Sequence, residues 1–163
     1  MGWVWWGCHT RLVEELTIRA ASIEDASAIR SCVAAAYALY VDRIGKPPAP
    51  MLDDYAQMVA RDVVQVAVRG EAVVGLIVMW LNEDHLYVDN IAVHPAAQAG
   101  GIGAALLAEA DAEARRSGVR EIRLYTNTAM IENLAYYSRK GFSETHRATD
   151  AGYERIYFSR FVS

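Results

Sequence analysis

Apolar positions along this chain of 163 residues follow two different periods, and each period predicts a different element. From Ile23 to Tyr40 apolar residues recur every three or four positions, which indicates a helix with one buried face. Ser22 precedes this helix and Asp25 follows three positions later, as in a capping box. Residues 63–69 and 72–80 are instead β-branched runs on either side of Gly70-Glu71, so they predict a hairpin.

The same patterns, with the Gly and Pro residues that end them, predict the remaining elements. These are strands over 17–20, 86–93, 121–125, 143–148 and 153–161, and helices over 51–59, 101–116 and 130–140. The resulting order predicts an α+β fold with a mixed, mostly antiparallel central sheet flanked by about four helices. We expect a single domain over residues 17–163, preceded by an N-terminal extension over residues 1–16 that contains three tryptophans.

Composition and charge exclude several classes of partner for this protein. The net charge is -4 and the pI about 5.5, which argues against a nucleic-acid surface and suits a cationic substrate without requiring one. No apolar run is long enough to span a membrane, and the first residues lack a secretory leader pattern. Cys8 and Cys32 lack metal-ligand spacing, and His85 and His94 lack helical partners. We therefore expect a cytoplasmic protein with free thiols, no metal, no nucleic acid and no membrane partner.

A glycine-rich corner joins the strand over 86–93 to the helix that follows it. It reads Gln98-Ala99-Gly100-Gly101-Ile102-Gly103-Ala104. The first amides of a helix have no partner within the helix and carry partial positive charge, and glycines allow an anion to approach them. The corner therefore predicts a cradle for a pyrophosphate, with a simple turn at a helix start as the alternative. Leu106 stands where a dinucleotide-binding loop needs Gly or Ala, and a P-loop lysine is missing.

Two motifs resemble those of the GCN5-related N-acetyltransferase (GNAT) family. Gln98, Gly101 and Gly103 match its Gln/Arg-x-x-Gly-x-Gly/Ala loop. A second motif downstream is matched by Asn133, Ala135, Tyr137, Gly141 and Phe142. The resemblance extends over about residues 17–162, because the order of strands and helices also agrees. It implies a sheet splayed into a V-shaped slot, acetyl-CoA as co-substrate, and acetyl transfer to a primary amine by direct attack in a ternary complex.

The resemblance also implies roles for individual residues. Tyr137 would protonate the departing thiolate, Asn133 would flank the thioester, and Tyr136 would only pack. The implied cofactor-binding set is Ile91, Ala92, Val93, Gln98, Ala99, Gly100, Gly101, Ile102, Gly103, Ala104 and Asn133. Family loops often carry a cation here, whereas this chain has no Lys or Arg between Arg69 and Arg115. Arg139 or Lys140 would then lie near the adenosine end.

The general base is less well specified. An amine attacks only when neutral, so some group must take its proton. We predict Asp89 first and Glu83 second, because the family often places a carboxylate on or before the splayed strand. An ordinary polar strand residue or a solvated turn acid is the alternative for each. Strand alternation predicts Tyr87, Asp89 and Ile91 on one face and Val88, Asn90 and Ala92 on the other.

The acceptor amine stays open between a polyamine, an aminoglycoside, an amino acid, a peptide N-terminus and a protein lysine. The segment from Arg43 to Met51 resembles a stretch of many bacterial family members, and the region from Arg43 to Asp54 lies where the family shapes the acceptor pocket. Two interpretations are open for Asp53, Asp54 and the adjacent Tyr55. They orient a cationic amine, or they simply begin a helix. Two other classes remain: a CoA-binding sensor or regulatory module without catalysis, and a self-association module built on the tryptophan-rich start. Edge strands leave room for a homodimer.

Overall fold

The computed structural model describes residues 14–163, so almost all of the predicted extension, including Cys8, lies outside the described residues. One sheet of seven strands runs through the molecule in the order β1-β2-β3-β4-β5-β7-β6. All neighbouring pairs are antiparallel except β4 and β5, which confirms the predicted α+β class with a mixed sheet. The strands are β1 Leu16–Ala20, β2 Val64–Arg69, β3 Ala72–Leu81, β4 Leu86–Val93, β5 Glu121–Asn127, β6 Ser143–Asp150 and β7 Tyr153–Phe161. β6 forms one edge of the sheet and exposes all eight of its residues.

Five α-helices lie within the described residues: α1 Ala26–Tyr37, α2 Tyr40–Ile44, α3 Tyr55–Ala60, α4 Ile102–Arg116 and α5 Ile131–Arg139. The single helix predicted from Ile23 to Tyr40 is wrong. A 3-10 turn over Ile23–Asp25 precedes α1, because the Asp25 carboxylate accepts the Ser22 amide at 2.7 Å. α2 follows after a turn, and both Tyr37 at the end of α1 and Tyr40 at the start of α2 are buried. None of these helices is long and apolar enough to cross a membrane.

The predicted helix over 51–59 also starts later than expected. A 3-10 turn over Ala49–Leu52 comes first, and Pro48 before it and Pro50 within it fix the backbone there. α3 then begins at Tyr55, because the Asp54 carboxylate accepts the Gln57 amide at 3.1 Å and caps the helix.

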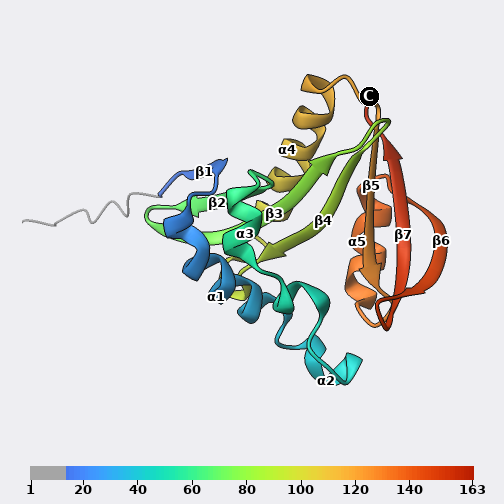
Figure 1. Cartoon of the computed structure of the whole chain (residues 1–163), viewed down its shortest axis with the longest axis horizontal. Helices are drawn as coiled ribbons and strands as arrows, with labels where there is room; N and C mark the ends of the chain where they lie inside the picture. Colours follow the sequence, from blue (N-terminus) through green and yellow to red (C-terminus); the bar gives the residue numbers. More distant parts are fainter. Residues whose placement is uncertain (1–13) are drawn as a thin grey trace, which may run out of the picture.

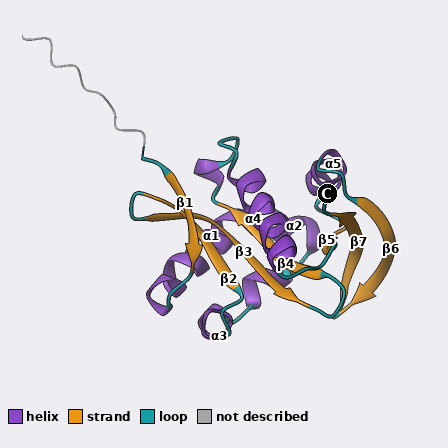
Figure 2. Cartoon of the chain, turned by 90° about the horizontal axis from the view of Figure 1, so that it is seen from above, coloured by secondary structure: helices purple, strands orange, loops and turns teal. Residues whose placement is uncertain are grey.

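Each face of the sheet has its own apolar core. α1 and α3 pack on one face, and α4 and the apolar side of α5 pack on the other (Figure 2). β3 shows how both cores are filled, because Leu76 and Val78 point to the α1 side while Ile77 and Met79 point to the α4 side. Cys32 lies in the α1-side core, where burial raises its pKa to about 11.

The functional geometry of the fold comes from the separation of β4 and β5. These strands pair only where Leu86–Val88 meet Ile122–Leu124. Beyond that point they diverge, and Figure 1 shows the two halves of the sheet close together at one end and apart at the other. This is the splayed arrangement expected from the sequence.

Candidate functional site

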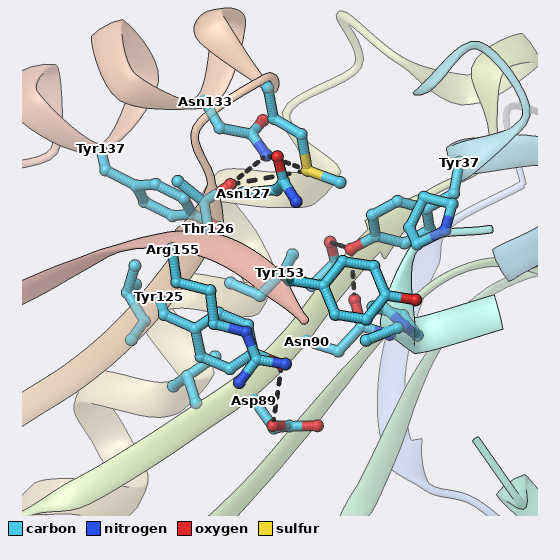
Figure 3. A pocket seen from close by; sticks show the side chains of 17 residues that line it. Tyr37, Asp89, Asn90, Tyr125, Thr126, Asn127, Asn133, Tyr137, Tyr153 and Arg155 are labelled. Carbon is cyan, nitrogen blue, oxygen red and sulfur yellow. Dashed lines mark hydrogen bonds between the residues drawn. The ribbon is translucent and has the colours of Figure 1, made fainter. Parts of the chain in front are cut away.

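Two connected cavities occupy the space where β4 and β5 diverge. The small cavity, with a volume of about 40 Å³, lies between the separated strand ends and is drawn in Figure 3. The large cavity, about 650 Å³, lies between α1, the glycine-rich corner and α5. Four residues line both cavities and mark their junction: Tyr37, Ile91, Asn133 and Tyr137.

The glycine-rich corner forms one wall of the large cavity. Gly101 has a φ of 77° and sits just before α4, while Ala99 has a φ of 64°, which is uncommon for a residue with a side chain. No side chain caps α4, so the amides of its first turn are left without a side-chain acceptor. The Gln98 side chain donates to the Val93 carbonyl at 3.3 Å and thereby ties the corner to the end of β4.

Gly103 keeps this wall hollow. A Cβ at this position would lie 2.9 Å from the hydroxyl oxygen of Tyr136. The ring of Tyr136 packs against the α4-side core, but the residue also lines the large cavity, so the prediction that it would only pack is wrong. Its buried hydroxyl has no hydrogen-bond partner among residues 14–163. An unpaired donor and uncapped helix amides therefore face the same space.

The large cavity is lined by ten of the eleven residues predicted to bind the cofactor. The exception is Gly100, which is not part of the lining; a Cβ there would lie 3.9 Å from Nη2 of Arg69. Arg139 and Lys140 also line the large cavity, so α5 brings cations to a corner that has none of its own. Lys140 lies over the ring of Tyr136, 5.6 Å from its centroid.

Tyr137 lies at the junction of the two cavities. Its ring packs against Phe142 and Phe158, with centroids 5.8 Å and 5.9 Å away, and the residue is 7% exposed. Its hydroxyl makes no hydrogen bond within the described part of the chain. Burial raises its pKa above the usual value, so the hydroxyl keeps its proton at neutral pH.

A β-bulge sets the direction of the β4 side chains. Val78 pairs with Asn90 and Met79 pairs with Val88, which leaves Asp89 as the extra residue. Val88 therefore joins the α4-side core, while the Asn90 side chain bonds on the α1 side. The predicted alternation is wrong, because the bulge changes the faces at this position and turns Asp89 toward the small cavity.

The Asp89 carboxylate is half-buried and lies near Tyr125 and Arg155. The Tyr125 hydroxyl donates to its carboxylate at 3.3 Å. Burial raises the pKa of Asp89, while Tyr125 and Arg155 partly offset that rise. The other predicted base, Glu83, lies on the exposed β3–β4 turn and lines neither cavity.

A buried hydrogen-bond chain supports the bulge from below. The Tyr37 hydroxyl donates to Asn90 Oδ1 at 2.5 Å, and Asn90 Nδ2 donates to the Tyr55 hydroxyl at 3.1 Å. The Tyr55 hydroxyl in turn donates to the Pro50 carbonyl at 2.6 Å. This chain joins α1, β4 and the turn before α3. Sequence reasoning missed it, since no local pattern connects Tyr37 with a residue 53 positions away.

Of the three residues expected to orient an acceptor, two have structural tasks. Asp54 caps α3, and Tyr55 is 1% exposed and engaged in the buried chain. Asp53 is different, because burial and the nearby Asp89 raise its pKa to about 6. Of the two aspartates, Asp53 is therefore the one coupled electrostatically to Asp89 in the slot.

His85 and His94 both bond to residues close to them in the sequence. His94 Nδ1 accepts the Ala96 amide at 3.1 Å, and His85 pairs with Asp84 at 2.6 Å. Residues 14–163 contain no group of three or more His, Cys, Asp or Glu side chains that could hold a metal.

The chain matches one family model and resembles several solved structures. The family model described as the acetyltransferase (GNAT) domain matches residues 60–144. A putative GNAT-family acetyltransferase from Desulfovibrio desulfuricans is 22% identical with a TM-score of 0.74, covering 91% of this chain and 100% of that one. No curated protein matches the sequence.

Two further solved structures show a similar fold. The PaiA N-acetyltransferase from Thermoplasma acidophilum, in complex with coenzyme A, is 18% identical with a TM-score of 0.72, covering 88% of this chain and 98% of that one. A GNAT-family acetyltransferase from Staphylococcus aureus is 13% identical with a TM-score of 0.76, covering 91% of this chain and 100% of that one.

Proposed function

The chain belongs to the GNAT acetyltransferase family, and from this premise we propose that it moves an acetyl group from acetyl-CoA to a primary amine by direct attack in a ternary complex. The observation that carries the proposal is the junction of the two cavities at Tyr137. One cavity is rich in free amides and suits a phosphorylated donor. The other contains a buried carboxylate and suits an amine.

The large cavity fits a CoA-type ligand. Acetyl-CoA supplies an activated thioester when it is bound. The uncapped amides of α4 would hold the pyrophosphate, and Gly103 provides the close approach that a Cβ would prevent. Arg139 and Lys140 would meet the remaining phosphate charge. Backbone groups of Ile91, Ala92 and Val93 would pair with the pantetheine amides.

Asp89 would act as the base. An alkylamine has a pKa of roughly 10 and is mostly protonated at neutral pH, so a carboxylate has to take its proton directly or through water. A raised pKa makes Asp89 a better base than an exposed aspartate. The amine nitrogen then bonds to the carbonyl carbon, and Asp89 passes the proton to solvent.

Tyr137 would act as the acid. As the carbon–sulfur bond breaks, its hydroxyl gives a proton to the departing sulfur and regains, through solvent, the second proton that the nitrogen loses as the amide forms. The raised pKa of Tyr137 keeps the proton on its hydroxyl at neutral pH, and its position at the junction of the two cavities supports this role. Asn133, whose amide donates to Thr126 at 3.1 Å, would flank the thioester.

The proposal is tested by free-thiol release with acetyl-CoA and a panel of amines, together with calorimetry of CoA binding. Tyr137→Phe and Asp89→Asn are each expected to lower kcat by about 10²-fold or more while the Kd for CoA is kept. Tyr87→Phe serves as the control, since Tyr87 lines neither cavity. CoA binding without thiol release from any amine would point to a non-catalytic module. The absence of CoA binding would overturn the proposal.

A further inference from the structure

The small cavity is roofed by a contact between two segments that are far apart in the sequence. The loop after α2 meets the β6–β7 turn, where Lys46 Nζ donates to the Gly152 carbonyl at 2.8 Å. The Tyr153 hydroxyl donates to the Pro47 carbonyl at 2.6 Å, and the Lys46 ammonium lies 4.0 Å from the centroid of the Tyr153 ring. Pro48 and Tyr153, at or next to this contact, line the small cavity, so the roof covers the cavity on this side.

Opposite charges line the walls of this cavity. Asp89 enters from the bulge of β4, and Arg155 enters from β7 (Figure 3). The Arg155 side chain is 11% exposed and stacks on Tyr125, with its guanidinium carbon 4.2 Å from the ring centroid. Asp150 accepts a hydrogen bond from Nη1 at 2.6 Å, so the guanidinium is held at one corner while the rest of it borders the cavity.

The guanidinium of Arg155, held by Tyr125 and Asp150, has a definite preference among ligands. Nη1 is already bonded to Asp150, and the remaining planar donors of the guanidinium match the oxygens of a carboxylate. Asp89 on the other wall matches an ammonium group. A polyamine would also offer an amine to Asp89, but it has no carboxylate that could use the remaining donors of Arg155.

We infer that the acceptor is a small zwitterion, such as a free amino acid, with a carboxylate beside the amine that is acetylated. Its amine would lie at Asp89 and its carboxylate at Arg155. This inference rests on the proposed function and specifies the acceptor class of the same site. The transfer itself is the one already given, with the amine nitrogen as nucleophile and the CoA thiol as leaving group.

The test compares each of the twenty free amino acids with its carboxamide and its decarboxylated amine in the thiol-release assay. We expect the best amino acid to exceed its decarboxylated amine by about ten- to a hundred-fold in kcat/KM. Arg155→Gln should remove most of this advantage by raising KM for the amino acid, with little change for the decarboxylated amine. Arg155→Lys should restore only part of it, because lysine lacks the planar fork.

Arg147→Gln is the matched control. Arg147 is an exposed arginine on the neighbouring strand β6, bonds to Glu144 and lines neither cavity, so its loss should change none of these ratios. The ratio between amino acid and decarboxylated amine in the wild-type protein needs no variant, so it tests the inference even if Arg155→Gln does not fold.

Each other outcome has a defined meaning. If decarboxylated amines, spermidine or peptide N-termini react as well as free amino acids, the zwitterion inference is wrong and the acetyltransferase proposal stands. If no amine releases thiol, the proposed function fails, and calorimetry with the same amino acids on the CoA-loaded protein decides the inference. Binding weakened by Arg155→Gln but not by Arg147→Gln would support it, and no binding would overturn it.

Discussion

Replacing Tyr37 by Phe tests the buried hydrogen-bond chain beneath the bulge. The change removes one hydroxyl and leaves the ring in place. Asn90 is 3% exposed, and its Oδ1 receives the Tyr37 hydrogen at 2.5 Å, so the substitution leaves a buried acceptor without this donor. Such a group costs about 1–3 kcal/mol. For a domain of this size, that loss corresponds to a decrease in Tm of about 2–4 °C per kcal/mol.

The assay is urea unfolding of the full chain followed by circular dichroism, with Tyr40→Phe as the control. Tyr40 is buried to the same 9% exposure as Tyr37, but its hydroxyl makes no hydrogen bond within residues 14–163, so its substitution should stay within about 0.5 kcal/mol. The midpoint of Tyr37→Phe should fall with an unchanged m-value. Equal midpoints for the two variants would refute the reasoning, because the hydroxyl would then contribute nothing beyond its ring.

Three more predictions follow from the site. Asp53→Asn should raise the free energy of unfolding at pH 8 by about 1–2 kcal/mol after allowance for solvent screening. Folding raises the pKa of Asp53 to about 6, so the cost of its charge appears as pH rises between about 4 and 6. Urea titrations that show the same gain at pH 3.5 would contradict this prediction. Gly103→Ala should weaken CoA binding in calorimetry by about tenfold or more, as the new methyl group meets the Tyr136 hydroxyl, and the double variant with Tyr136→Phe should recover part of the affinity. In a Cys8→Ser background, Cys32 should react with a thiol reagent at pH 8 only after denaturant is added, since burial raises its pKa to about 11; rapid reaction of the folded protein would disprove this.

The glycine-rich corner could be predicted from the sequence because all of its determinants are local. A strand end, a turn and a helix start follow one another over a few residues, and α4 begins at Ile102, one residue from the expected position. The prediction for Tyr137 comes from the family resemblance of Asn133, Tyr137 and Gly141, which lie within one helix and its end. Features of this kind depend on neighbouring residues, so a single sequence contains them.

Apart from Asp89 and the segment after Arg43, both suggested by the family resemblance, the acceptor side could not be predicted, because it depends on strand register and on distant contacts. The bulge at Asp89 exists only relative to Val78 and Met79 of β3, and one shifted residue reverses the faces of a strand. Arg155 reaches the small cavity because β7 lies beside β5, a pairing that no local pattern encodes. The roof joins residues 106 positions apart, such as Lys46 and Gly152.

The outer strand β6 has a consequence for the protein at high concentration. A bare sheet edge offers unpaired main-chain groups to any other extended chain, and apolar edges of this kind begin aggregates. Every residue of β6 is polar except Ala148, and the strand carries both signs of charge in Glu144, Arg147 and Asp150. Pairing a second strand along it would require these ions to lose water, so the composition of β6 limits further growth of the sheet and protects this edge from amyloid-like stacking.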